Sequence, residues 1–259
     1  MEKIDIIKSI SERTGGDIYL GVVGAVRTGK STFIKKFIEN LVVPNIEDEY
    51  ERKRCLDEIP QTAQGKTIMT IEPKFVPSTA AKIKVEEFET NIKLVDCVGY
   101  VIPAAKGYED EMGEPRMVKT PWYDEDIPFV EAAEIGTEKV IRDHSTIGIV
   151  VTTDGSIGDI TRNNYIEAEN EVISELKEIG KPFIVLLNSA HPTLPETERL
   201  AEKLKEEHNV PVIPISAETM NEKDVYNILK EALYEFPVLN VKVDIPDWIG
   251  TLNPNHPIK

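Results

Sequence analysis

Short apolar runs alternate along the chain with longer amphipathic segments. Buried strands are predicted for IYLGVV (residues 18–23), IKLVD (92–96), TIGIVVTT (146–153), FIVLLN (183–188) and VPVIPIS (210–216). A more polar, alternating segment, AKIKVEEF, precedes the second of these runs and predicts a further strand.

Between the runs, apolar positions recur about every third or fourth residue, which is typical of helices packed on one side. Helices are predicted over residues 31–41, 129–144, 165–179, 196–208 and 222–234. Gly180 and Pro182 follow the third of these helices, as expected at a helix end.

The alternation of apolar strands and helices predicts an α/β fold, in which helices cover both faces of a mainly parallel sheet. Ligands of such folds bind at the carboxyl ends of the strands. Two proline-containing segments, residues 43–80 and 98–128, interrupt the alternation, and long irregular segments of this kind tend to be functional. Residues 1–237 are expected to form one nucleotide-binding domain, and residues 238–259 the start of a further region that is truncated here.

The composition of the chain argues against several classes of function. The 259 residues include 46 acidic and 30 basic side chains, a formal net charge of −16, which opposes binding to nucleic acid. The longest apolar runs are too short to cross a bilayer, and the charged N-terminus lacks the apolar core of a secretory signal. Cys55 and Cys97 form no C-x-x-C motif, so a reduced, cytoplasmic protein is expected.

A glycine-rich motif, G-x-x-x-x-G-K-[ST], lies between the first strand and its helix. In this motif backbone N–H groups surround phosphate oxygens, the lysine contacts the terminal phosphates, and the hydroxyl ligates Mg²⁺. The predicted phosphate-binding residues are Gly24, Ala25, Val26, Arg27, Thr28, Gly29, Lys30, Ser31 and Thr32. Arg27 and Arg116 are further candidates for contact with phosphate charge.

The strand at residues 92–96 ends in a D-x-x-G motif, Asp96 to Gly99. Asp96 is predicted to hold Mg²⁺ and the Gly99 N–H to face the γ-phosphate. Thr70, with Thr67 as second choice, is predicted to ligate Mg²⁺ and contact the γ-phosphate. Tyr100 occupies the position at which GTPases often place a water-orienting glutamine. A phenol lacks the paired donor and acceptor of a carboxamide, so water positioning is expected to come from elsewhere.

The base-reading motif of GTPases, N-K-x-D, is altered. Asn188 is present, whereas Ser189 and His191 replace the lysine and the aspartate. Because neutral histidine cannot accept both guanine donors, guanine preference is expected to be lost. Ser216 and Ala217 match the start of the last GTPase motif and are predicted to lie beside the nucleotide. Together the motifs predict a P-loop NTPase of GTPase-like, TRAFAC-type topology that no longer selects guanine.

Several segments together, including GVVGAVRTGKSTFIKKF, QGKTIMTIEPKFVP, LVDCVGY and HSTIGIVVTTDGSIGDI, closely resemble the stage IV sporulation protein A family. The resemblance extends to about Trp248. It implies a magnesium-dependent ATPase that hydrolyses ATP slowly and self-assembles into the basement layer of the spore coat. By this resemblance Lys30, Asp96 and Thr70 are the catalytic residues, and Ser31, Thr70 and Asp96 bind the metal.

The resemblance also implies a location in the mother-cell cytoplasm at the outer forespore membrane. Partners would be a small membrane-anchoring amphipathic peptide and coat proteins, bound through a C-terminal part that this chain lacks. The family often has a second threonine after the sensor threonine, where this chain has Ile71, which has no hydroxyl group. Two alternatives stay open: a GTPase-type switch, and a scaffold that binds nucleotide without turnover.

Overall fold

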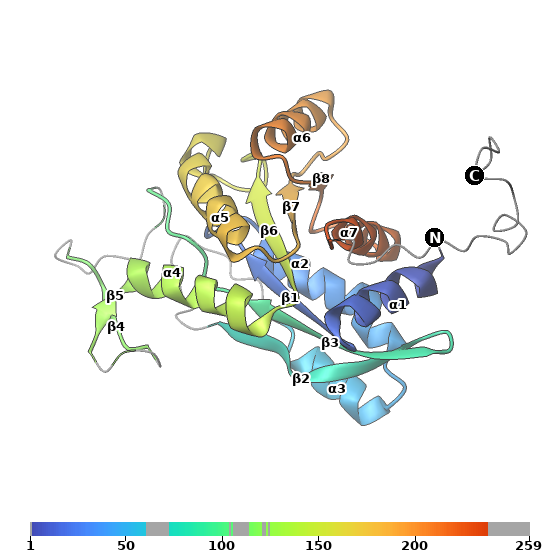
Figure 1. The fold of residues 1–259 in the computed structure, drawn as a ribbon. Helices are drawn as coiled ribbons and strands as arrows, with labels where there is room; N and C mark the ends of the chain where they lie inside the picture. Colours follow the sequence, from blue (N-terminus) through green and yellow to red (C-terminus); the bar gives the residue numbers. More distant parts are fainter. Residues whose placement is uncertain are drawn as a thin grey trace, which may run out of the picture.

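The structure, a computed structural model, describes residues 2–60, 73–103, 105, 114–120, 123 and 125–237. Its centre is a six-stranded sheet with the order β2–β3–β1–β6–β7–β8 (Figure 1). The strands are β1 (Asp17–Val23), β2 (Lys74–Val85), β3 (Phe88–Asp96), β6 (Ile147–Thr153), β7 (Phe183–Asn188) and β8 (Val212–Ile215). Only the edge strand β2 pairs antiparallel within this sheet, and the other pairs are parallel. The predicted α/β class with a mainly parallel sheet is confirmed.

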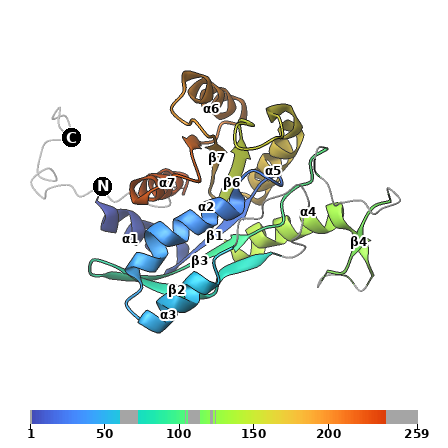
Figure 2. The same cartoon turned by 180° about the vertical axis from the view of Figure 1, so that it is seen from behind.

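Helices cover both faces of the sheet, as predicted (Figures 1 and 2). One face packs against α1 (Lys3–Thr14), α2 (Lys30–Phe37), α3 (Glu49–Asp57) and α7 (Glu222–Tyr234) in a single apolar cluster. The other face packs against α4 (Phe129–Lys139) and α5 (Ile166–Ile179). Helix α6 (Pro195–His208) contributes Ala201 and Leu204 to a small cluster with Leu187 of β7. Successive residues of β1 and β6 are buried because both faces of each strand are covered.

Two of the predicted helices change geometry before they end. The helix predicted over residues 31–41 comprises α2 and a π-helical turn, η1 (Ile38–Val42), followed by a 3₁₀ turn, η2 (Val43–Asn45). Asn40 lies in the π-helical turn, and its amide donates to the Lys36 and Met220 carbonyls. Helix α4 likewise continues into a π-helical turn, η3 (Val140–His144). A second 3₁₀ turn, η4 (Arg162–Asn164), precedes α5.

Regular structure also occurs where the sequence pattern predicted none. Helix α1 buries Ile6, Ile7 and Ile10, although its charged residues conceal the pattern. The segment 43–80, predicted to be irregular, contains α3 and the first half of β2. Asp48 caps α3 by accepting a hydrogen bond from the Glu51 N–H at 2.7 Å, which compensates for the weak amphipathicity of that helix. The segment 98–128 contains a small sheet formed by β4 (Met117–Val118) and β5 (Ile127–Pro128).

Candidate functional site

The carboxyl ends of the parallel strands meet at one edge of the sheet, where most of the predicted site residues lie. Residues 24–31 follow β1, Asp96 ends β3, Asn188 ends β7 and Ser216 follows β8. These segments are up to 192 residues apart in the chain (Gly24 to Ser216), and the parallel register brings them together. Thr70, Thr67 and Ile71 lie outside the described residues.

The loop of residues 24–31 requires glycine at two positions. Gly24 has φ +135°, and a Cβ atom there would lie 2.2 Å from the Val151 carbonyl oxygen. Gly29 has φ +93°, and a Cβ atom there would lie 2.3 Å from Nδ2 of Asn188. Since L-residues rarely adopt such angles and the neighbours leave no space, larger side chains are excluded. Arg27 adopts φ +68° without being glycine, so the loop also contains a conformation that side chains disfavour.

Helix α2 begins at Lys30, directly after Gly29, so the loop leads into a helix N-terminus. The unpaired N–H groups and the dipole of such a terminus favour an anion. Ser31 and Thr32 lie half-buried in the first turn of α2. The path from strand through glycine turn to helix is the arrangement in which backbone N–H groups can surround phosphate oxygens.

The ammonium of Lys30 is buried inside the curl of this loop, with 6% of the residue exposed. Its Nζ donates to the carbonyl oxygens of Ala25 at 2.7 Å and of Gly24 at 3.2 Å. Burial lowers the pKa of Lys30 from 10.5 to about 8, although the nearby Asp96 carboxylate opposes the shift. The two carbonyls fix the position of the ammonium and leave one of its three protons for a ligand.

Asp96 and Ser31 form the acidic part of the site. The Ser31 hydroxyl donates to Oδ2 of Asp96 at 2.7 Å. The other carboxylate oxygen, Oδ1, is buried and accepts no hydrogen bond from the part of the chain that the structure describes. Burial raises the pKa of Asp96, whereas the hydrogen bond from Ser31 and the charge of Lys30 oppose the shift. A buried, unpartnered carboxylate oxygen beside a hydroxyl fits a hard divalent cation or a water bound to one.

The D-x-x-G segment pairs with the glycine loop through its backbone. The Val26 N–H donates to the Tyr100 carbonyl at 2.8 Å, and the Tyr100 N–H donates to the Gly24 carbonyl at 3.1 Å. Gly99 has φ +93°, and a Cβ atom there would lie 2.4 Å from Nζ of Lys30. Gly99 therefore lies against the ammonium that the sequence predicts to contact the terminal phosphates.

The side chain of Tyr100 reaches helix α5. It is buried, and its hydroxyl donates to a carboxylate oxygen of Glu175 in α5. Burial raises the pKa of the Tyr100 phenol, and the Glu175 carboxylate adds to the shift. In the structure the phenol therefore connects the segment after β3 to α5.

Asn188 joins three of the loops at this edge. Its amide nitrogen donates to the Thr28 carbonyl, and its amide oxygen accepts from the Ala217 N–H, both at 2.9 Å. The side chain is 4% exposed, so both polar ends are satisfied inside the protein. Asn188 therefore fixes the glycine loop relative to the segment with Ser216 and Ala217. Its predicted contact with a nucleotide would be indirect, through that loop.

The loop between β6 and α5 is a part of the site that the sequence analysis missed. Asp154 follows β6 directly, and its Oδ1 accepts from the N–H and the hydroxyl of Ser156, at 2.9 and 2.6 Å. The Ser156 hydroxyl accepts from the Ala190 N–H at 2.9 Å, so this loop contacts the segment after β7. The sequence does contain an indication of this part of the site. Asp154 comes immediately after a predicted buried strand, and Asp96 lies at the end of another.

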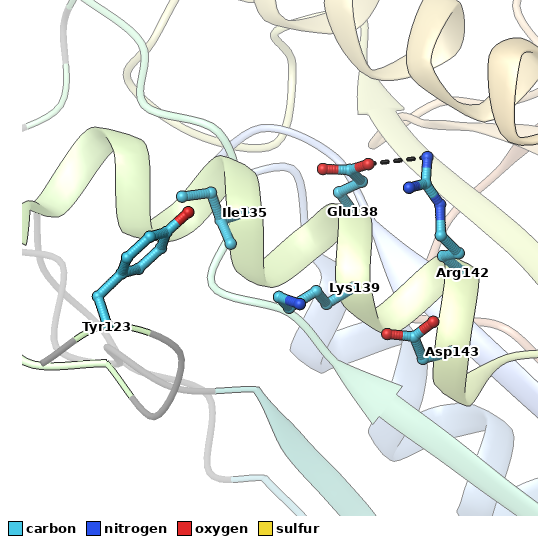
Figure 3. A pocket seen from close by; sticks show the side chains of 6 residues that line it. All are labelled: Tyr123, Ile135, Glu138, Lys139, Arg142 and Asp143. Atoms are coloured by element: carbon cyan, nitrogen blue, oxygen red, sulfur yellow. Dashed lines mark ion pairs between the residues drawn. The ribbon is translucent and has the colours of Figure 1, made fainter.

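A surface hollow of about 220 Å³ lies elsewhere, on the outer side of α4 and η3 (Figure 3). It is lined by Tyr123, Ile135, Glu138, Lys139, Arg142 and Asp143. Arg142 pairs with Glu138 at 2.8 Å, one helical turn away. None of the predicted site residues lines it. Across the described residues, no group of three or more His, Cys, Asp or Glu side chains is arranged to hold a metal ion, and no helix has the length and apolarity needed to cross a membrane.

Comparison with known proteins identifies the family of the chain. The family model described as the ATPase domain of stage IV sporulation protein A matches residues 1–237. The chain belongs to this family. Proteins named stage IV sporulation protein A from Bacillus anthracis and Bacillus subtilis (strain 168) are each 64% identical to it over 257 residues. The protein of that name from Clostridioides difficile (strain 630) is 51% identical over 256 residues.

The matches cover 98–99% of the chain and 52% of each relative. The chain thus spans about half the length of the curated relatives it matches. It contains the ATPase domain of the family, and the resemblance stated from the sequence is confirmed.

Proposed function

We propose that the chain binds ATP with Mg²⁺ at the carboxyl edge of the sheet and hydrolyses it slowly, using a P-loop of GTPase-like type. The observation that supports this most directly is the position of Lys30. Its ammonium is buried beside Gly99, held by the carbonyls of Gly24 and Ala25, and has one proton left for an anion.

Residues of the chain bind and orient the triphosphate in this proposal. The N–H groups of the glycine loop and the N-terminus of α2 contact phosphate oxygens, and Lys30 places positive charge at the terminal phosphates. Ser31 and Asp96 would hold Mg²⁺, with Thr70 as the third predicted ligand. Bound there, the ion would withdraw charge from the phosphate oxygens.

Hydrolysis transfers the γ-phosphoryl group of ATP to a water that attacks in line, and ADP is the leaving group. Of the described residues, Tyr100 occupies the position of the water-orienting glutamine of GTPases, and its phenol is bonded to Glu175. Turnover is therefore expected to be slow unless a partner or a second copy contributes a group. Loss of the phosphate would release Gly99 from its ligand and change the segment around it.

For the whole protein we propose a role in building the basement layer of the spore coat by self-assembly, in the mother-cell cytoplasm at the forespore surface. The name of the relatives supports a role in sporulation. The proposed partners, a small amphipathic peptide and coat proteins, would bind the longer protein rather than this chain.

The first experiment compares wild type with Lys30→Ala, using Lys36→Ala on the same helix as the control. We expect Lys30→Ala to weaken Mg-ATP binding by about 10- to 100-fold, because it removes a charge-assisted hydrogen bond. Calorimetry measures the binding and a phosphate-release assay the turnover. Wild-type binding no tighter than that of Lys30→Ala would refute the proposal.

Competition between ATP and GTP tests the base. Ser189 and His191 replace the residues that bind guanine in GTPases, so we expect GTP not to be preferred. Clearly tighter binding of GTP would favour a GTPase-type switch.

A scaffold that binds ATP without turnover is the second candidate, and the engagement of Tyr100 with Glu175 favours it. Tight ATP binding without phosphate release, in this chain and in the longer protein, would support that candidate.

A further inference from the structure

The lysine of the GTPase base-reading motif has no counterpart in this chain. Ser189 takes its place, and its side chain is fully buried rather than extended toward the glycine loop. The Ser189 hydroxyl accepts from the His191 N–H at 2.9 Å and lies 3.3 Å from the Ser156 hydroxyl. A side chain this short and this engaged cannot supply the long aliphatic stem that a lysine would place at this position.

Ile157, in the loop between β6 and α5, lies beside the glycine loop. Glycine has no Cβ atom, but one added to Gly29 would lie 3.8 Å from Cδ1 of Ile157. The same added atom would lie next to the Asn188 amide. Ile157 is half-buried. Ile157 belongs to none of the apolar clusters of the described residues, nor to the half-buried residues packed against them, whereas Ile160 packs against the cluster under α5. The apolar end of Ile157 therefore borders the site and not the core.

The direction of the base follows from the order of the strands. The phosphates are proposed to lie on the loop after β1, and the base-reading segments follow β7 and β8. In the sheet β6 lies between β1 and β7. A Cβ atom on Gly29 would lie 3.8 Å from Cδ1 of Ile157, on the loop after β6, and 2.3 Å from Nδ2 of Asn188. Ile157 is therefore on the path from the proposed phosphate site to the base.

Asp154 holds this loop in place. Besides its two bonds to Ser156, its Oδ2 accepts from the Thr197 hydroxyl of α6 at 3.4 Å, and Thr197 also donates to the His191 carbonyl at 3.1 Å. Burial raises the pKa of Asp154, but hydrogen bonds from Ser156, Ser189 and Thr197 outweigh it and hold the pKa below its ordinary value. The carboxylate stays charged at neutral pH and connects the loop to the segment after β7.

We propose that Ile157 forms an apolar wall against the face of the purine base, and that Asp154 is the positioning residue that holds the Ile157 loop beside Asn188. The inference rests on the proposed function and assigns the base subsite of the same site. The ligand group is the flat, apolar face of adenine. An aliphatic wall contacts the ring face and does not depend on the edge groups that guanine presents.

The test separates contact with the base from contact with the phosphates. Ile157→Ala and Ile160→Ala are matched variants, since both shorten an isoleucine in the same loop. Calorimetry measures the affinity of each for Mg-ATP and for Mg-tripolyphosphate, which has no base, and thermal unfolding measures stability.

We expect Ile157→Ala to weaken ATP binding roughly tenfold, as for the loss of a buried aliphatic contact, and to leave tripolyphosphate binding unchanged. Ile157→Leu retains an apolar wall and should bind ATP nearly as wild type does. Ile160→Ala should lower the melting temperature and retain the ratio of the two affinities. Asp154→Asn should weaken ATP binding more than tripolyphosphate binding, without a matching loss of stability.

Equal ATP affinity in wild type and Ile157→Ala would overturn the inference and leave the proposed function standing. A parallel loss of ATP and tripolyphosphate affinity would also overturn it, because the effect would then lie in the phosphate loop. If wild type binds neither ligand, the proposed function itself is wrong.

Discussion

At the scale of single residues, the site combines two buried charges that are only partly balanced. Lys30 is held by carbonyl oxygens and Asp96 by one hydroxyl, and each pKa is shifted by burial against the influence of the other group. Such shifts are common where a protein binds a charged ligand. They make the site sensitive to pH.

The pKa of Lys30 leads to the first prediction. Because the pKa is about 8 in the folded protein and 10.5 ordinarily, burying the ammonium opposes folding by about 3 kcal/mol at pH 7, and this opposition is relieved as pH rises from 8 toward 10.5. Phosphate binding requires the charged form. We therefore expect ATP affinity to fall above pH 8, approaching tenfold per pH unit, with proton uptake on binding near pH 8.5.

Calorimetry in buffers of different ionisation enthalpy measures both the ATP affinity and the number of protons taken up on binding. Lys36→Ala should show the same pH dependence as wild type. An affinity that is constant between pH 7 and pH 9.5 would mean that Lys30 does not titrate at the site.

The second prediction concerns Gly99. Gly99→Ala would place a Cβ atom 2.4 Å from Nζ of Lys30 and 2.8 Å from the Gly24 carbonyl, at φ +93°. The Gly24 carbonyl is part of the backbone and cannot move aside without distorting the glycine loop. We therefore expect a loss of stability of about 1–3 kcal/mol and loss of ATP binding. Gly180→Ala is the control, since Gly180 also has a positive φ, +73°, but no atom lies within 4 Å of its added Cβ. Thermal unfolding and calorimetry compare the two, and wild-type ATP binding by Gly99→Ala would contradict the prediction.

At the scale of elements, buried polar contacts determine how α5 meets the sheet. Arg162 in η4 bonds both carboxylate oxygens of Glu169 in α5, at 2.8 and 2.5 Å, and its guanidinium also donates to Thr152 of β6 at 3.2 Å. The Glu169 side chain is 1% exposed and that of Arg162 is 17% exposed. The pair holds the start of α5 against the end of β6, next to the loop with Asp154.

This ion pair gives the third prediction. Arg162→Met leaves the Glu169 carboxylate buried without its partner and should lower the free energy of unfolding by about 3–5 kcal/mol. The double variant Arg162→Met, Glu169→Leu removes both charges and should recover most of that loss. Urea unfolding measures the cycle. If the double variant loses as much free energy of unfolding as the two single variants lose together, the two side chains are not coupled.

The local sequence pattern was sufficient to predict most helices and strands, but not all of them. The spacing in residues 165–179 predicted α5 to within one residue, because its apolar positions and Gly180 are local signals. The π-helical turn after α2 depends on the Asn40 amide reaching Met220, which is 180 residues away. Helix α3 depends on its cap and on one buried residue, Cys55, so its hydrophobic pattern is too weak to detect.

At the scale of the whole molecule, the sheet separates two large apolar clusters, and the proposed ligand lies at the edge where the loops from both sides meet. Binding there should connect segments that are far apart in the sequence. The opposite end of the sheet, including the turn between β2 and β3, lies away from that edge (Figure 1).

The fourth prediction follows from this geometry. With Mg-ATP, hydrogen exchange should slow in residues 24–32, 97–100, 154–158 and 188–191, and stay unchanged in α1 and in the β2–β3 turn. The reason is that the ligand would engage or order the backbone of the first four segments only. Mass spectrometry on wild type and Lys30→Ala tests this, with weaker protection expected in the variant at the same ATP concentration. Protection confined to other segments would place the ligand elsewhere.

The sequence by itself determined the α/β class, the strand–glycine loop–helix unit and the family, because these depend on local periodicity and on residues adjacent in the chain. Only the tertiary structure decided that Tyr100 bonds to Glu175, that Asn188 joins three loops, and that Ile157 lies beside Gly29 of the glycine loop. These contacts join residues 29 to 160 positions apart, and the register of the parallel strands sets which of them meet. No local pattern specifies that register.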